Sequence, residues 1–162
     1  MINSENEKEL VIARDFAAPR ELVWRVWNEP AHIEKWFGPK GFRTKVRSMD
    51  FRKGGKWEYV MIGPDGLEYP FGGIYLEVDP IERVVSTDDF GEEFQERSPE
   101  MSMPKIISVT TLFEDRGEAT RIVIKTIHAS AEDKKKHEEM GVEEGWASSF
   151  EKIDVYLTEL KG

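Results

Sequence analysis

Histidine, cysteine and serine are the residue types that most often carry metal binding or nucleophilic catalysis, and this chain uses them sparingly. It has three histidines, His32, His128 and His137, and no cysteine. No two of the histidines have the spacing of metal ligands on one helix, for example i and i+4. Two adjacent serines, Ser148 and Ser149, lack the glycine-flanked signature of a hydrolase nucleophile. We therefore expect no metal site, no serine nucleophile and no cofactor.

A set of large apolar side chains indicates a different chemistry, the binding of an apolar or amphipathic molecule. Trp57, Tyr59 and Met61 alternate along one predicted strand, and Trp146 and Phe150 are four residues apart on a predicted helix. Small-molecule sites are typically concave and lined by such residues. Core packing is the alternative for each of them, because buried aromatic side chains usually only pack. The expected ligand-binding residues are Trp36, Trp57, Tyr59, Met61, Tyr75, Trp146 and Phe150.

Two polar side chains are weaker candidates for acid-base catalysis in the same cavity. Tyr75 and Glu77 share one face of a predicted strand, so Glu77 points inward if Tyr75 does. His128 lies at the end of the last predicted strand, in alternation with Ile122 and Ile124. A buried carboxylate or imidazole has either a structural partner or a shifted pKa that suits proton transfer. We favour structural roles for Glu77 and His128, and with them a protein that is not an enzyme.

A run of basic residues stands out in a chain whose net charge is -9. Most such runs are solvated strand faces, and the alternative is a surface for an anionic partner or a second copy of the chain. The overall acidity argues against general nucleic-acid binding, which needs an excess of Lys and Arg to neutralise phosphates. The run comprises Lys40, Arg43, Lys45, Arg47, Arg52, Lys53 and Lys56.

The segment from Val142 to Leu160 must carry the helical part of the ligand-binding set. Its opposite face is polar, so the apolar stripe has to be buried against something, and the chain before it has mainly the pattern of strands. We therefore predict a curved sheet wrapped around this helix. The stripe recurs every three or four residues, at Val142, Trp146, Phe150, Ile153, Leu157 and Leu160.

The other elements follow from turn residues and alternation. Pro19 suits a helix start, and Asn28-Glu29-Pro30 ends that helix, because the residue before a proline is pushed out of helical geometry. This predicts two short helices after the first strand, from Pro19 and over about 31–37. Residues 91–104 have the composition of a mobile loop, and Ser130 begins a charged helix. We expect Gly141 to separate this helix from the last one, and the alternative is one helix bent at Gly141. Strands are expected at residues 10–16, from 42, and at 56–62, 69–78, 84–90, 105–113 and 120–128.

Length and composition limit the domain organisation. A chain of 162 residues has the size of one domain, so we expect a disordered tail at 1–7 and a single domain over 8–162. No apolar run approaches the roughly 20 residues of a membrane-spanning helix. The first eight residues lack the basic start and apolar centre of a secretion signal. Together with the absence of cysteine, this pattern favours a cytoplasmic protein.

Several short motifs together resemble one protein family over about residues 8–160. They are Ala18-Pro19-Arg20-Glu21-Leu22-Val23-Trp24, Trp36-Phe37-Gly38-Pro39, Asp50-Phe51-Arg52-Lys53-Gly54-Gly55-Lys56-Trp57, Pro64-Asp65-Gly66, Gly73-Ile74-Tyr75-Leu76-Glu77 and Glu144-Gly145-Trp146. As a set they are similar to the activator of heat-shock-protein-90 ATPase homologue branch of the START-like (Bet v 1-like, SRPBCC) superfamily. The resemblance implies an α+β helix-grip fold, in which a curved antiparallel sheet clasps a long C-terminal helix, with a cavity between them.

The resemblance leaves three functions open, because members of this superfamily bind lipids and hormones, cyclise polyketides or activate a chaperone. Our leading hypothesis is a protein that binds a small apolar or amphipathic molecule between sheet and helix. A cyclase- or hydrolase-like enzyme that uses Glu77 or His128 is the first alternative. The second is an interaction module for a chaperone, acting through the basic strand. The chaperone activators also carry an N-terminal docking domain that has no counterpart in this sequence, so we rank this function below ligand binding.

Overall fold

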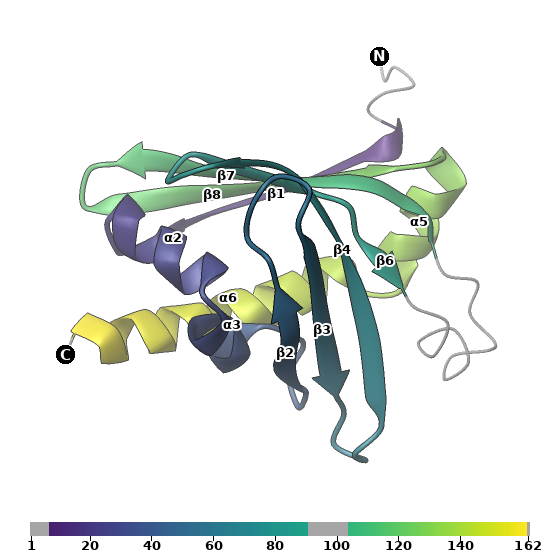
Figure 1. The fold of residues 1–162 in the computed structure, drawn as a ribbon, viewed down its shortest axis with the longest axis horizontal. Coiled ribbons are helices and arrows are strands. Elements are labelled where there is room, and N and C mark those ends of the chain that lie inside the picture. The colour runs from purple at the N-terminus through teal and green to yellow at the C-terminus, as the bar shows by residue number, and fades with distance from the viewer. Residues whose placement is uncertain (1–6, 91–103, 162) are drawn as a thin grey trace.

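The computed structural model describes residues 7–90 and 104–161, which form a strongly curved antiparallel sheet around a long helix (Figure 1). The α+β helix-grip fold predicted from the sequence is confirmed. The strands are β1 (Glu9–Phe16), β2 (Arg43–Met49), β3 (Lys56–Ile62), β4 (Glu68–Asp79), β5 (Arg83–Ser86), β6 (Asp89–Phe90), β7 (Ile106–Arg116) and β8 (Ala119–His128). Their order across the sheet is β1-β8-β7-β5-β4-β3-β2, and β6 pairs with β4 beside this path.

The helices lie on the concave side of the sheet. The long C-terminal helix crosses beneath β1, β7 and β8 (Figure 1). The first two helices lie between the sheet and the C-terminal part of this long helix (Figure 1). Ser130 caps the charged helix, because its hydroxyl accepts a hydrogen bond from the backbone N–H of Asp133. Gly141 follows with a φ of 87°, which glycine adopts without strain, and so separates the last two helices as expected. The helices are α2 (Arg20–Asn28), α3 (Pro30–Trp36), α5 (Ala131–Glu139) and α6 (Val142–Lys161).

The hydrophobic core lies between the concave face and α6. Phe150, Ile153 and Leu157 of the predicted stripe are buried, and Trp146 packs against the same cluster while partly accessible. Leu160 was expected to complete the stripe, but its side chain is 40% exposed. The apolar face of α6 therefore loses its partners in the last turn.

The strand β4 joins the two halves of the sheet. Residues up to Ile74 pair with β3, and those from Tyr75 on pair with β5. A Cβ atom at Gly72 would lie 2.4 Å from the carbonyl oxygen of Trp57, and one at Gly73 would lie 2.1 Å from the carbonyl oxygen of Thr87. Only glycine permits these approaches, which fold the two halves of the sheet around one concave surface.

The segment predicted as one strand at residues 84–90 forms two. β5 pairs with β4 and β7, whereas β6, after a gap of two residues, pairs with β4 alone. The apolar pattern stops at the same place, because residues 86–89 are Ser-Thr-Asp-Asp. Most of the loop predicted at 91–104 lies outside the described residues.

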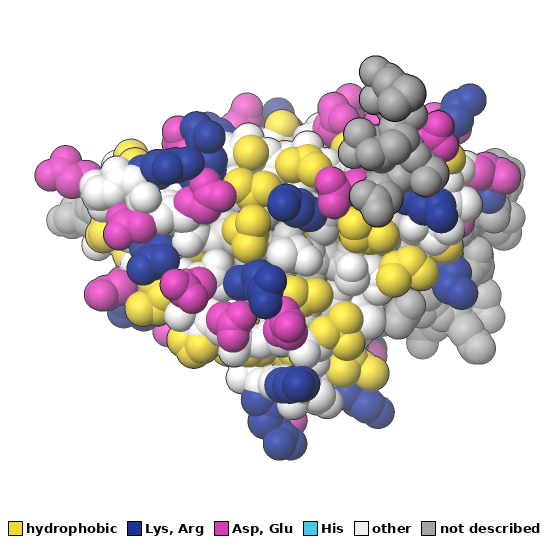
Figure 2. Space-filling view, turned by 90° about the horizontal axis from the view of Figure 1, so that it is seen from above, with side chains coloured by type: hydrophobic (Ala, Val, Ile, Leu, Met, Phe, Trp, Pro, Cys, Tyr) yellow, Lys and Arg dark blue, Asp and Glu magenta, His cyan; other side chains and the backbone are white. Residues whose placement is uncertain are grey.

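The convex side of the sheet faces away from α6. Figure 2 shows apolar side chains on this side interleaved with Lys, Arg, Asp and Glu side chains. Exposed apolar residues of the sheet include Val11 of β1 and Leu76 of β4. In the part of the chain that the structure describes, no helix combines the length and the apolar composition needed to cross a membrane.

Candidate functional site

A cavity with two chambers lies between the concave face of the sheet and the first half of α6. The outer chamber, of about 200 Å³, is bordered by Val142, Gly145, Trp146 and Ser149 of α6 and by residues of β7, β8 and α5. The inner chamber, of about 100 Å³, lies against α2, α3 and strands β3 to β5. Both chambers share the wall residues Phe37, Phe71, Asp88, Val109 and Trp146. The two spaces therefore adjoin one another.

Most of the residues expected to bind a ligand border this cavity. The aromatic pairs that build the walls are close: the ring centroids of Trp57 and Tyr59 lie 4.7 Å apart, and those of Phe37 and Phe71 lie 5.8 Å apart and stacked. Mostly apolar walls with a few polar groups are the usual make-up of a small-molecule site. Trp36, Trp57, Tyr59 and Tyr75 border the inner chamber, Met61 borders the outer chamber, and Trp146 borders both.

Phe150 borders neither of these two chambers, contrary to our expectation. Its side chain is 4% exposed, and its ring packs edge-on against Phe16, 5.5 Å away between centroids. Trp146 stacks on its other side at 5.6 Å, and Trp27 lies 6.4 Å away. The helical spacing correctly placed Phe150 on the same face as Trp146. The aromatic residues of β1 and α2 fill the space in front of it, so Phe150 is core.

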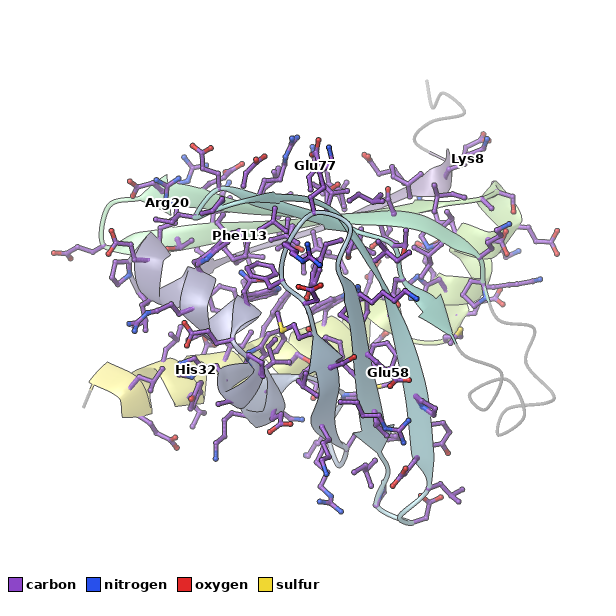
Figure 3. All side chains as sticks on the ribbon, in the orientation of Figure 1. Lys8, Arg20, His32, Glu58, Glu77 and Phe113 are labelled. Carbon is purple, nitrogen blue, oxygen red and sulfur yellow. The ribbon has the colours of Figure 1, made fainter. Side chains whose placement is uncertain are left out.

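Glu77 lies outside the cavity, so the expectation that it points inward with Tyr75 is wrong. A bulge shifts the strand register between Tyr75, which pairs with Ser86, and Glu77, which pairs with Val85. The extra residue turns these two side chains to opposite faces. Tyr75 is 5% exposed, whereas the carboxylate of Glu77 contacts the Arg83 guanidinium at 2.6 Å on the outer side of the sheet (Figure 3).

His128 is buried, and both of its ring nitrogens have partners. Nδ1 lies 2.9 Å from the carbonyl oxygen of Lys8, and Nε2 lies 2.9 Å from Nδ1 of His137. Burial lowers the pKa of His128, against an opposite effect of the hydrogen bond to Lys8. Such an arrangement supports a structural or positioning role. In the ranges 7–90 and 104–161, no three His, Cys, Asp or Glu side chains are grouped so as to hold a metal ion.

His137 is a wall residue of the outer chamber that the sequence did not indicate. Burial, together with the adjacent His128, lowers the pKa of His137 to about 4, so its imidazole is neutral near pH 7. The two histidines are nine residues apart, and α5 must fold back against the end of β8 to bring them together. No local spacing could have predicted that contact.

Phe71 and Asp88 were also missed, although alternation contains a signal for Phe71. Phe71 is four residues before Tyr75 on the same strand, and equal parity within a strand places both on one face. Asp88 lies in the break between β5 and β6, where strand alternation does not apply. Both residues border both chambers.

The polar residues that border the inner chamber include Trp57, Tyr59, Tyr75 and Asp88, together with Asn28, Ser86 and Thr111. Burial raises the pKa of Tyr59 and of Tyr75, which keeps both phenols protonated, and the nearby Tyr75 hydroxyl also raises the pKa of Tyr59. The charge of Asp88 raises the pKa of Tyr59 further. The indole Nε1 of Trp57 is buried and has no hydrogen-bond partner among the described residues. The wall of the inner chamber thus contains a buried donor without a partner and a negative charge.

The basic run lies in and around β2, an edge strand of the sheet. Arg47 contacts Glu68 at 3.2 Å and Glu58 at 3.9 Å, and the backbone N–H of Val46 donates to the carboxylate of Glu34 at 2.8 Å. Charged side chains on an edge strand discourage pairing with another chain. This role accounts for the basic residues of β2 as a solvated face.

Comparison with known proteins gives concordant results. A family profile described as "Activator of Hsp90 ATPase homolog 1-like protein" matches residues 17–158. Among solved structures, protein Ms6760 from Mycobacterium smegmatis is 30% identical, with 98% of this chain and 96% of that chain covered and a TM-score of 0.82. A protein from Nitrosomonas europaea is 29% identical, with 96% and 97% covered and a TM-score of 0.80. One from Arthrobacter aurescens is 26% identical, with 98% and 90% covered and a TM-score of 0.84. A comparison with curated proteins gave no significant match.

Proposed function

Because the chain belongs to the Activator of Hsp90 ATPase homolog 1-like family, whose fold serves ligand-binding and interaction modules, we propose that this protein binds a small molecule in its cavity. The ligand would lie between the concave face of the sheet and α6, in contact with Trp57, Tyr75 and Trp146. This proposal keeps the leading hypothesis from the sequence and narrows the ligand by size and polarity.

The size of the chambers favours a compound of one or two rings. An apolar cavity of about 150 Å³ holds a benzene molecule. The outer chamber is somewhat larger, at about 200 Å³, and the inner chamber adds about 100 Å³ beside it. A long acyl chain needs more room than these two spaces offer, so we rank fatty acids below ring compounds.

The indole of Trp57 gives the strongest support for a ligand. Its side chain is 8% exposed, and its Nε1 faces no acceptor among the described residues. A buried donor without a partner costs about 1–3 kcal/mol, and proteins rarely leave one in a core that serves packing alone. An acceptor on a bound molecule would recover this energy.

A chemical-shift titration tests the proposal. We would add indole, 1-naphthol, 4-hydroxyacetophenone and palmitate in turn to isotopically labelled protein and follow the indole N–H signals of the tryptophans. We expect the ring compounds to shift the signals of Trp57 and Trp146. The indole of Trp24 is the internal reference, because it packs on Phe51 and Phe113 and borders neither chamber.

A matched pair of variants separates binding in the cavity from binding elsewhere. Trp57→Phe should weaken the ring compounds, whereas Trp24→Phe should leave them unchanged. If no ring compound shifts Trp57 or Trp146, or if the two folded variants bind equally well, ligand binding in this cavity is refuted.

A further inference from the structure

The hydrogen-bond chain that ends at His137 determines which of its ring nitrogens carries a proton. The carbonyl oxygen of Lys8 can only accept, so Nδ1 of His128, 2.9 Å away, must be the protonated nitrogen. In a neutral imidazole the other nitrogen is then an acceptor. Nε2 of His128 therefore receives the hydrogen bond, and Nδ1 of His137, at 2.9 Å, donates it. Figure 3 shows Lys8 just before β1, at the end of the sheet where α5 lies.

Because Nδ1 of His137 carries the proton, Nε2 of a neutral His137 is unprotonated. Burial of both rings keeps both imidazoles neutral near pH 7, because it lowers both pKa values. His137 borders the outer chamber, and its Nε2 makes no hydrogen bond to another described residue. The outer chamber thus contains a fixed hydrogen-bond acceptor, held in place by His128 as a positioning residue.

The wall of the inner chamber contains a hydrogen-bond donor. The indole of Trp57 borders this chamber, and its buried Nε1 has no hydrogen-bond partner among the described residues. Asp88 borders both chambers, and its charge is felt at Tyr59. A negative charge in the shared wall disfavours an anionic ligand, because like charges repel strongly where water is excluded.

We propose that the cavity selects an uncharged ring compound with a hydrogen-bond donor, such as a phenolic hydroxyl, for Nε2 of His137, and an acceptor, such as a carbonyl, for Nε1 of Trp57. The inference rests on the proposed function and names the ligand class for the same site. Hydroxyaryl ketones and aldehydes have this polarity and fit the size of the chambers. Fatty acids and other carboxylates do not.

Three compounds of similar size separate the two hydrogen bonds. 4-Hydroxyacetophenone has both the donor and the acceptor, 4-methoxyacetophenone lacks the donor, and 4-ethylphenol lacks the acceptor. Titrations of the wild-type protein should show that each incomplete compound binds about tenfold more weakly, the effect of one buried hydrogen bond. Equal affinity for all three would overturn the inference while ligand binding itself stood. No binding of any ring compound would overturn the proposed function as well.

Variants assign each preference to its residue. His137→Phe should bind the hydroxy and methoxy compounds equally and still prefer both to 4-ethylphenol. Trp57→Phe should lose the preference for the two ketones over 4-ethylphenol and keep the preference for the hydroxy compound over the methoxy compound. His32→Phe is the matched control, because His32 pairs with Tyr156 and borders neither chamber, and it should keep both preferences. If His137→Phe still distinguished the hydroxy from the methoxy compound by tenfold, His137 would not be the acceptor.

A measurement on the wild-type protein is independent of whether the variants fold. Long-range proton–nitrogen correlation spectra at pH 7 should show His137 as the neutral tautomer with the proton on Nδ1. Its Nε2 resonance should shift on addition of 4-hydroxyacetophenone and stay unchanged with 4-methoxyacetophenone. A His137 protonated at Nε2 would overturn the inference.

Discussion

Replacing Gly145 with leucine should close the outer chamber without harming the fold. Gly145 lies on the cavity side of α6, between Val142 and Ser149, which both border the same chamber. A Cβ atom built on Gly145 meets no other heavy atom within 4 Å, so the space in front of it is open. Position 145 therefore accepts a larger side chain that can grow into the cavity.

The size of each effect can be worked out from this geometry. Glycine inside a helix costs about 1 kcal/mol relative to alanine, so Gly145→Ala should stabilise the protein by about that amount and raise its Tm by about 2–4 °C. Gly145→Leu should keep most of this gain. The leucine adds three carbons beyond alanine, and a ligand that loses room for about three buried carbons at about 0.8 kcal/mol each should bind about 2 kcal/mol, or roughly thirtyfold, more weakly.

Two measurements check this prediction on the same pair of variants. Urea unfolding gives the free energy of unfolding, and a fluorescence or chemical-shift titration with 4-hydroxyacetophenone gives the dissociation constant. Gly145→Ala is the control, because it changes helix propensity while leaving most of the chamber empty. Equal affinities of folded Gly145→Ala and Gly145→Leu would show that the ligand does not occupy the outer chamber.

Three further outcomes follow from the buried and exposed groups. Phe150→Ala should lower the free energy of unfolding, measured with urea, by about 3–5 kcal/mol, because the Phe150 side chain is 4% exposed and packed against other rings. Val155→Ala is the control at a 61% exposed position of the same helix, and it should change this free energy by about 0.5 kcal/mol or less. Folding lowers the pKa of His137 from 6.5 to about 4, so the unfolded chain binds more protons than the folded protein between pH 4 and 6.5. The free energy of unfolding should therefore fall, by on the order of 2 kcal/mol, as the pH drops from about 6.5 to 4. A pH series of urea unfolding should show a shallower fall for His137→Phe, and an unchanged slope would contradict the assigned pKa. Glu77→Gln should leave the affinity for 4-hydroxyacetophenone unaltered in the same titration, since Glu77 lies on the outer face, and a tenfold change would place it in the site.

Most of the fold could be predicted because its signals are local. The stripe from Val142 to Leu157 has the period of a helix, and the alternation of Trp57, Tyr59 and Met61 has the period of a strand. The capping serine at 130 and Gly141 set the limits of α5 correctly. An amphipathic helix after a series of half-buried strands leaves few ways to bury both apolar surfaces, and a sheet curved around the helix is one of them.

The polar part of the candidate site could not be predicted with the same success, because it depends on irregularities. A bulge in β4 reverses the side of the sheet to which Glu77 points, and alternation alone carries no sign of it. The break after Ser86 divides one expected strand into two, and Asp88, which borders both chambers, lies in that break. Apolar periodicity describes regular strands and does not show where a bulge changes the register.

The helix, the strands and the aromatic walls could be predicted, because each follows from the spacing of neighbouring residues along one element. Which aromatic residues face empty space and which, like Phe150, face other rings depends on tertiary packing. Tertiary packing also brings His128 and His137 together, since their contact depends on the angle at which α5 returns to the end of β8. Packing between distant elements sets these features, and no residue spacing along the chain encodes them directly.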